Sequence, residues 1–298
     1  MPTPFVIGIK SYDLTIEEKN LLSELEPLGI ILFSRNINSI EQTQNLIKQA
    51  RIASKNPGLL ILIDEEGGKV SRTNHIFSDQ ILAAKIIGKL YKTDPNAALR
   101  LIDETTNQII RRLKILDINV CCTPVCDLSF IESDDVIGSR SYSDNPEIVI
   151  KLAQRCCKIL AASDILPIIK HIPGHGRANC DSHLELPIIK TKEDLLIKTD
   201  FAIFKAMNQM PMAMTAHIIY EAIDKENPVT TSKKAIQYIR NKIGFTHMII
   251  SDDICMKALK GTTKAKVKAT LDAGCDLVLH CNGDIKELED ILDYQKSL

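Results

Sequence analysis

Three short apolar runs of the sequence end in side chains that can do chemistry. One is followed by Asp64, a second by Lys170 and His171, and a third by Asp252. A carboxylate can accept hydrogen bonds from substrate hydroxyls or attack an electrophilic carbon, and a histidine can transfer protons near neutral pH. These positions are therefore the first candidates for an active site.

A further acid–base pair follows Lys170 and His171 along the chain. The segment IPGHG at 172–176 leads to Asp181 and His183. An aspartate two residues before a histidine can orient the imidazole and stabilise its charged form. We interpret the pair as a candidate general acid/base in a loop over the site.

Other polar residues near these runs allow more than one interpretation. The acidic segment that begins at Asp64 could be a solvated turn, and its two glycines would let the backbone bend sharply. Arg140 could bring a guanidinium to a substrate or tie down a loop. We expect His217 to be hydrogen-bonded inside the protein, and Asp253 to turn outward or to cap the next helix.

Eight short apolar runs, rich in Ile, Val and Leu, alternate with helical patterns. Such runs do not alternate strictly with polar residues, which is typical of parallel strands buried on both faces. The eight apolar runs cover residues 5–9, 29–33, 59–63, 118–122, 166–169, 212–215, 248–250 and 276–279.

The segments between these runs carry helix-start signals. Thr15 with Glu18 forms a capping-box pattern, and Asp94 precedes a proline at the first helical position. We also expect a helix to begin at Thr191 and to bury Leu195, Leu196, Phe201 and Phe204.

Eight strands with intervening helices predict a single-domain (β/α)8 TIM-type barrel over residues 1–298. The length of 298 residues suits one barrel. An open doubly wound sheet is the main rival, but the first run lacks a glycine-rich phosphate loop after it. In a barrel, the site lies at the carboxyl ends of the strands.

The composition narrows the class of function and the location. The formal net charge is −1, which does not indicate a nucleic-acid surface, and no apolar stretch has the length of a membrane span. The nine cysteines show no C-x-x-C spacing, and the N-terminus shows no signal-peptide pattern. We therefore expect a cytoplasmic location.

Taken together, four motifs resemble glycoside hydrolase family 3, and within it the cytoplasmic β-N-acetylglucosaminidases of peptidoglycan recycling. They are IDEEGGKVSR at 63–72, IGSRSYSDNP at 137–146, KHIPGHG at 170–176 with DSH at 181–183, and SDDICM at 251–256. The third motif is the most specific. The sequence departs from the usual family pattern at Glu65, at Lys69 and in the short segment 73–78.

The resemblance implies a role for each matching residue. Asp252 matches the catalytic nucleophile, His183 the general acid/base and Asp181 its partner. The expected substrate-binding residues are Asp64, Arg72, Arg140, Lys170 and His171.

The resemblance also implies the reaction. A retaining hydrolysis would remove terminal β-1,4-linked N-acetylglucosamine from anhydro-muropeptides through a covalent glycosyl-aspartate. No cofactor and no metal are implied, and we expect a monomer.

Four alternatives stay open at this point. The enzyme could pass the sugar to phosphate instead of water, or Lys170 could form a Schiff base with a carbonyl substrate. The chain could also be a non-catalytic barrel scaffold. A metal-dependent hydrolase would have to use His171, His175, Asp181, His183 and His217, whose spacing matches no metal-site signature.

Overall fold

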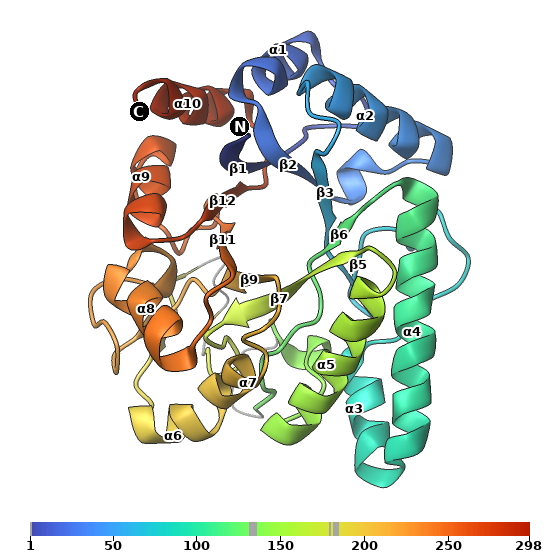
Figure 1. Ribbon diagram of the computed structural model, residues 1–298, viewed down its shortest axis with the longest axis vertical. Coiled ribbons are helices and arrows are strands. Elements are labelled where there is room, and N and C mark those ends of the chain that lie inside the picture. Colours follow the sequence, from blue (N-terminus) through green and yellow to red (C-terminus); the bar gives the residue numbers. More distant parts are fainter. Residues whose placement is uncertain (1, 131–135, 179, 181–184) are drawn as a thin grey trace.

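A computed structural model describes residues 2–130, 136–178, 180 and 185–298. Eight parallel strands close into a barrel in the order β1-β12-β11-β9-β7-β6-β3-β2, and helices surround it (Figure 1). The predicted (β/α)8 barrel is confirmed. Each predicted apolar run overlaps one barrel strand. The strands are β1 (Thr3–Gly8), β2 (Pro27–Leu32), β3 (Leu60–Ile63), β6 (Val120–Cys121), β7 (Leu166–Ile172), β9 (Met212–Thr215), β11 (Met248–Asp253) and β12 (Leu277–His280).

The surrounding helices begin largely at the predicted caps. Thr15 and Glu18 form the expected capping box, and Asp94 accepts a hydrogen bond from the third residue of its helix. The helices are α1 (Ile16–Leu25), α2 (Ile40–Ala53), α3 (Ala84–Thr93), α4 (Pro95–Leu116), α5 (Pro146–Ala161), α6 (Glu193–Lys198), α7 (Asp200–Ala206), α8 (Lys233–Tyr238), α9 (Thr263–Ala273) and α10 (Ile285–Lys296).

Alternate residues of the strands form two separate apolar cores. One set fills the barrel interior, for example Val6 of β1, Ile31 of β2 and Ile250 of β11. The neighbours Phe5 and Ile30 belong to the larger cluster between the strands and the helices. Because successive strand residues point to opposite faces, every strand serves both cores, and this explains the continuous apolar runs.

Two expectations about these elements are wrong in detail. Strand β7 continues to Ile172, so Lys170 and His171 lie inside a strand rather than after it. The helix expected from Thr191 begins at Glu193, and the side chain of Leu195 is exposed, whereas Leu196, Phe201 and Phe204 are buried as expected. The short helices α6 and α7 meet at Thr199, so an extended amphipathic pattern overestimates the length of one helix.

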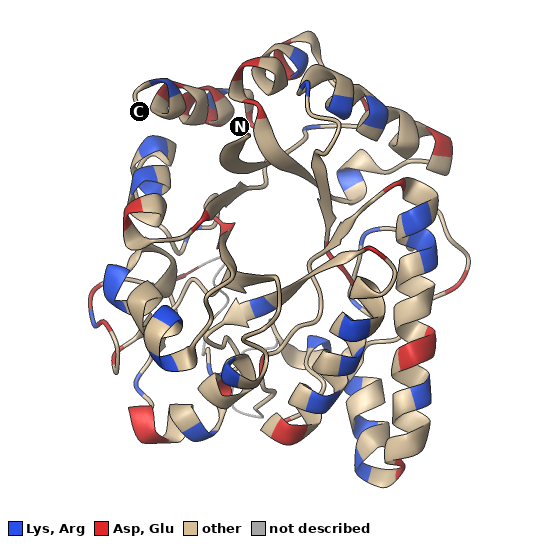
Figure 2. Cartoon of the chain, viewed as in Figure 1, with Lys and Arg blue, Asp and Glu red and all other residues tan. Residues whose placement is uncertain are grey.

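Charged residues lie mainly on the outer helices, whereas the barrel strands are mostly uncharged (Figure 2). No helix in the described part of the chain is both long enough and apolar enough to cross a membrane. Lys170 on β7 is an exception inside the barrel wall, and its neighbours define the site described below.

We predict that Gly88→Ala destabilises the protein. A Cβ atom at Gly88 in α3 would lie 1.6 Å from the carbonyl oxygen of Tyr142, which is part of the segment that carries Arg140. The clash with backbone should outweigh the helix-propensity gain of about 1 kcal/mol and lower the free energy of unfolding by roughly 1–3 kcal/mol. Urea denaturation measures the difference.

Gly58→Ala is the matched control for this substitution. A Cβ atom there would have its nearest neighbour, the side chain of Asn56, at 3.4 Å, which is an ordinary contact. We expect a change within about 0.5 kcal/mol. Equal effects of the two substitutions would show that the packing of α3 against Tyr142 does not matter.

Candidate active site

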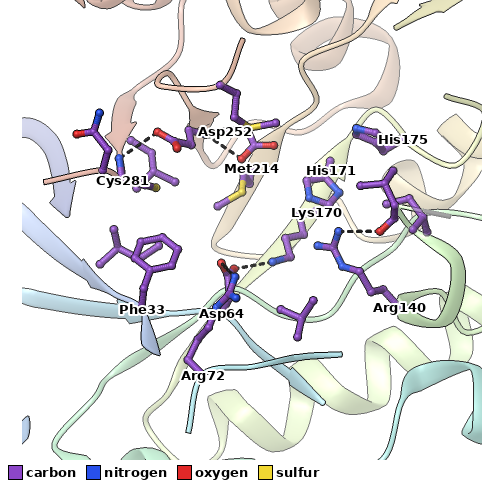
Figure 3. Close-up of a pocket in the computed structure, with 18 of the residues that line it drawn as sticks. Phe33, Asp64, Arg72, Arg140, Lys170, His171, His175, Met214, Asp252 and Cys281 are labelled. Atoms are coloured by element: carbon purple, nitrogen blue, oxygen red, sulfur yellow. Dashed lines mark hydrogen bonds and ion pairs between the residues drawn. The ribbon is translucent and has the colours of Figure 1, made fainter. Parts of the chain in front are cut away.

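A cavity of about 380 Å³ opens at the carboxyl ends of the strands. Side chains from opposite walls of the barrel surround it, with Asp252 across from Asp64 and Lys170 (Figure 3). The lining contains all the predicted substrate-binding residues and the predicted nucleophile. These lining residues are Asp64, Arg72, Arg140, Lys170, His171 and Asp252.

The ammonium group of Lys170 lies between two carboxylates. Its Nζ is 2.7 Å from Oδ1 of Asp64 and 2.6 Å from Oε1 of Glu66. The side chain of Lys170 is only 2% exposed. Asp64 follows β3, and Glu66 belongs to the short strand β4 (Glu65–Gly67), so the lysine ties β7 to the segment that follows β3.

Two guanidinium groups extend this arrangement. Arg140 donates to Glu66 with Nε and Nη2, both at 2.8 Å, and Arg72 donates to Oδ2 of Asp64 at 3.2 Å. The side chain of Arg140 therefore ties down its loop and also lines the cavity, and its contact with a substrate stays a prediction. Paired donors of this kind give fixed geometry.

The charges in this cluster determine its protonation. Burial alone would raise the pKa of Asp64, but Lys170 and Arg72 outweigh it and hold that pKa well below its usual range. Burial alone would lower the pKa of Lys170, but the two carboxylates raise it well above the ordinary lysine value. A Schiff-base lysine must lose its proton, so this environment disfavours the Schiff-base alternative.

A second layer holds Arg72 in place. Glu65 is fully buried and accepts hydrogen bonds from the backbone N–H of Arg72 at 2.9 Å and from Thr73 at 3.0 Å. Arg112 of α4, itself buried, donates to the same carboxylate at 3.3 Å. Glu65, one of the departures from the family pattern, therefore anchors the turn between β4 and β5 (Val70–Ser71).

The glycine in this turn is required by a close approach. Gly67 has a φ of +91°, and a Cβ atom there would lie 2.3 Å from the carbonyl oxygen of Leu82. This confirms the sharp bend expected from the glycine pair after Asp64.

Asp127 organises the histidine side of the cavity. Its Oδ2 is 2.6 Å from Nδ1 of His171, and its Oδ1 accepts from the backbone N–H of His175 at 2.7 Å. Burial raises the pKa of Asp127, but His171 and His175 reverse this and lower it. The ionised Asp127 accepts the Nδ1–H of His171, so the Nε2 side of that ring is the one available to a ligand. Burial lowers the pKa of His175 to about 4, so its ring is neutral at pH 7.

Asp252 lies in β11, across the cavity from Asp64. Its backbone N–H donates to Oγ1 of Thr215 at 3.2 Å, and its Oδ1 accepts from the N–H of Asp253 at 2.8 Å. Burial disfavours its charged form, but His217, His171 and the N–H of Asp253 lower its pKa. Asp252 is therefore ionised at neutral pH, as attack on an electrophilic carbon requires.

His217 is a buried structural residue, as expected. Nδ1 lies 2.7 Å from Oγ1 of Thr230, and Nε2 donates to the carbonyl of Asp253 at 2.9 Å. The expectation for Asp253 is wrong. Its Oδ1 caps no helix but accepts from the N–H groups of Cys255 and Cys281, each at 3.0 Å, and so ties the end of β11 to β12.

The root of the loop after β7 is firmly held. Tyr220 donates to the carbonyl of Gly174 at 2.7 Å, and Arg177 donates to Asp200 at 2.7 Å. A Cβ atom at Gly176 would lie 2.0 Å from the carbonyl oxygen of Leu128. Downstream, β8 (Ile188–Ile189) pairs in parallel with β10 (Ile219–Tyr220). The predicted catalytic residues Asp181 and His183 lie outside the described residues.

Sequence reasoning missed Glu66, Asp127 and Arg112 as parts of the site. Glu66 stands two residues after Asp64 and was a visible candidate. Asp127 follows its strand by six residues, so a search limited to strand ends does not find it. Arg112 lies near the C-terminal end of α4, and only its burial at 2% exposure distinguishes it from a surface arginine.

The metal alternative gains no support from the histidines that are described. His217 uses both ring nitrogens in hydrogen bonds. Among the described residues, the one group of three ligands close enough to hold a metal lies elsewhere and contains neither His171 nor His175.

Comparisons with known proteins agree on one family. Residues 7–298 match the glycosyl hydrolase family 3 N-terminal domain. A β-hexosaminidase of Neisseria gonorrhoeae is 36% identical over 284 residues, which cover 94% of this chain and 78% of that protein. A β-hexosaminidase of Bordetella pertussis is 32% identical over 299 residues, with coverages of 99% and 84%. The crystal structure of Neisseria gonorrhoeae NagZ in complex with N-trifluoroacetyl-D-glucosamine is similar, with a TM-score of 0.88, 34% identity and coverages of 97% and 84%.

We predict that Asp64→Asn destabilises the protein in a pH-dependent way. The folded state lowers the pKa of Asp64, so its stabilising effect is fully present above the unfolded value of about 3.9 and is lost as the pH falls below it. The variant should lose about 3 kcal/mol at pH 7, and the difference from wild type should shrink below about pH 4. Urea midpoints between pH 3 and pH 7 measure this.

Asp103→Asn is the control for this prediction. Asp103 pairs with Arg155 at 2.6 Å on the surface, where the side chains are 31% and 42% exposed. An exposed pair of this kind contributes less than about 1 kcal/mol. A pH-independent loss in Asp64→Asn would contradict the assigned charge state of Asp64.

Proposed function

Because this chain belongs to glycosyl hydrolase family 3 and matches its β-hexosaminidases over nearly its whole length, we propose that it removes terminal β-linked N-acetylglucosamine with retention of configuration. It is a glycoside hydrolase. The observation that carries the proposed mechanism is the ionised Asp252 facing the cluster of Asp64 and Lys170 across one cavity. This arrangement puts a nucleophile on one side of a sugar and hydrogen-bonding groups on the other.

Asp252 is the proposed nucleophile. Its carboxylate attacks the anomeric carbon as the bond to the leaving oxygen breaks, and a covalent glycosyl-aspartate forms. Its low pKa keeps it charged, and the N–H of Asp253 orients it from a distance of 2.8 Å. A carboxylate held by backbone needs little reorganisation before it reacts.

His183 is the proposed acid/base, with Asp181 as its partner. His183 gives a proton to the leaving oxygen in the first step, and takes one from water when the glycosyl-aspartate is hydrolysed. The carboxylate of Asp181 would hold the imidazole tautomer and keep its basicity near neutral pH. The described residues on both sides of this pair are held in place, since Arg177 donates to Asp200 and β8 pairs with β10.

The proposed sugar-binding groups are Asp64, Arg72, Arg140, Lys170 and His171. Asp64 and Lys170 already pair with each other, so each can add a hydrogen bond to a hydroxyl without a change of position. Such preorganised donors and acceptors hold the substrate in a reactive orientation. A cavity of about 380 Å³ suits one sugar unit better than a long chain.

The proposed leaving group is the remainder of a peptidoglycan fragment that carries 1,6-anhydro-N-acetylmuramic acid. The similarity to NagZ supports this choice. We further propose a cytoplasmic, monomeric enzyme with one catalytic domain over residues 1–298. Buried cysteines of the described barrel, such as Cys121, Cys156 and Cys275, are thiols rather than disulfides, which agrees with a reducing compartment.

We predict that the protein releases nitrophenol from an aryl β-N-acetylglucosaminide and not from the aryl β-glucoside. Asp252→Ala should lower kcat by roughly 10⁴-fold or more, because the covalent step is lost. Unchanged unfolding midpoints would show that the variant is folded. Activity that survives the substitution would rule out Asp252 as the nucleophile.

Added phosphate separates hydrolysis from phosphorolysis in the same assay. If water is the acceptor, product analysis shows free N-acetylglucosamine with and without phosphate. If a sugar phosphate accumulates instead, the enzyme is a phosphorylase.

We predict that His183→Ala loses activity mainly on substrates with poor leaving groups. Protonation of the leaving oxygen matters least for an activated aryl oxygen, so the loss should grow with leaving-group pKa. Comparing kcat/KM over a series of aryl glycosides measures this slope. A uniform loss across the series would show that His183 is not the acid, and Asp181→Asn should cost less than Asp252→Ala.

A further inference from the structure

A sulfur, a nitrogen and an oxygen atom converge beside the catalytic cavity. Ligand atoms of Cys255, His280 and Glu287 all lie within 4.8 Å of one another. Cys255 follows β11, His280 is the last residue of β12, and Glu287 lies in the first turn of α10. The segment after β11, the end of β12 and the start of α10 thus contribute to one small cluster.

The spacing of these atoms is close to that of a tetrahedral metal site. Oε2 of Glu287 lies 2.8 Å from Nε2 of His280 and 3.9 Å from Sγ of Cys255. Around zinc, with bonds of about 2.0–2.3 Å, neighbouring ligand atoms lie roughly 3.3–3.6 Å apart. A shift of the carboxylate by about half an ångström, away from the imidazole and toward the sulfur, would meet these distances.

One side of the cluster is buried and the other side is open to solvent. The side chain of His280 is 1% exposed, whereas that of Glu287 is 40% exposed. An ion can therefore enter from the solvent past the carboxylate and bind against the buried imidazole. A mixed set of sulfur, nitrogen and oxygen ligands is typical of zinc.

We propose that Cys255, His280 and Glu287 bind one zinc ion, with a water molecule in the fourth position. This site is separate from the catalytic residues, and the inference does not rest on the proposed hydrolytic activity. A zinc–sulfur bond forms as the thiol proton of Cys255 leaves to solvent. The thiolate and the carboxylate of Glu287 then balance the two positive charges of the ion.

The bound ion would connect segments that shape the cavity. Asp253 and Cys281 line the cavity and flank the cluster in sequence, and Asp253 already accepts from the N–H groups of Cys255 and Cys281. Zinc would add a second link between β11 and β12 and extend it to α10. We therefore expect zinc to raise the thermal unfolding midpoint.

The cluster lacks the hydrogen bond that usually orients a metal-binding histidine. Nδ1 of His280 has no hydrogen-bond partner among the described residues. Ligating histidines usually donate their other N–H to an acceptor, and loss of that contact costs about 10–100-fold in affinity. We therefore expect weaker binding than in a structural zinc site with four protein ligands.

Zinc titration of the metal-free, full-length protein against a coloured chelator tests the proposal. We expect one zinc per chain in the wild type, and binding at least about 10-fold weaker in Cys255→Ser and in His280→Gln. Glu287→Gln is a third variant. It should fold normally because the side chain of Glu287 is exposed. Of the wild type and these three variants, only the wild type should gain thermal stability from zinc.

Two controls make the result specific. Cys275→Ser changes a cysteine outside the cluster, whose Sγ contacts the carbonyl of Thr230 at 3.6 Å, and this variant should bind zinc as the wild type does. With cobalt in place of zinc, a thiolate-to-cobalt absorption band should appear in the wild type and in Cys281→Ser, but not in Cys255→Ser.

Two outcomes would overturn the proposal. The first is no zinc binding by the wild type beyond that of the three ligand variants. The second is a zinc ion lost in Asp252→Asn and kept in Cys255→Ser, which would assign it to the catalytic cavity. After either outcome, the three side chains would be only a hydrogen-bonded contact between β12 and α10.

Discussion

The buried ammonium group of Lys170 is the interaction on which the cavity depends. It separates the carboxylates of Asp64 and Glu66, which would otherwise face each other in a poorly solvated space. Arg72 and Arg140 then bind the outer sides of these carboxylates, so positive and negative groups alternate along one wall. Burying any one of these charged groups alone would cost much free energy, but each is paired here with a group of opposite charge. Because the cluster carries one more positive than negative group and Asp252 stands opposite, the electric field across the cavity has a fixed direction.

The barrel makes this charged cluster possible because stability and function depend on different residues of the strands. Alternate strand residues fill either the interior or the space beneath the helices, so the strands stay rigid whatever occupies their carboxyl ends. The polar residues then need only local support. Glu65 and Arg112 supply it for the turn that carries Arg72, and Asp127 supplies it for His171. Second-layer contacts of this kind keep functional groups in position before the substrate arrives.

Much of this organisation could be predicted from the sequence, because parallel strands and helix caps leave strong local patterns. The eight strands, the cap at Asp94 and the gathering of Asp64, Lys170 and Asp252 depend on such patterns. The role of Asp253 and the contribution of Glu66, Asp127 and Arg112 could not be predicted, because they depend on which side chains meet across elements far apart in the chain. Arg112 is the clearest case, since its partner Glu65 is 47 residues away. The length of β7 was underestimated because Lys170 and His171 are polar, and only the buried ion pairs explain polar residues inside a strand.

The anchored root of the loop after β7 has a consequence for how such enzymes diversify. Arg177 binds Asp200 on one side of the segment, and β8 pairs with β10 on the other. Both flanks of the segment are thus fastened to neighbouring elements, α7 on one side and β10 on the other. Neither contact involves the proposed acid/base pair, Asp181 and His183. A protein engineer can therefore exchange the residues between the two anchors to alter the proposed proton transfer and leave both contacts and the cavity intact.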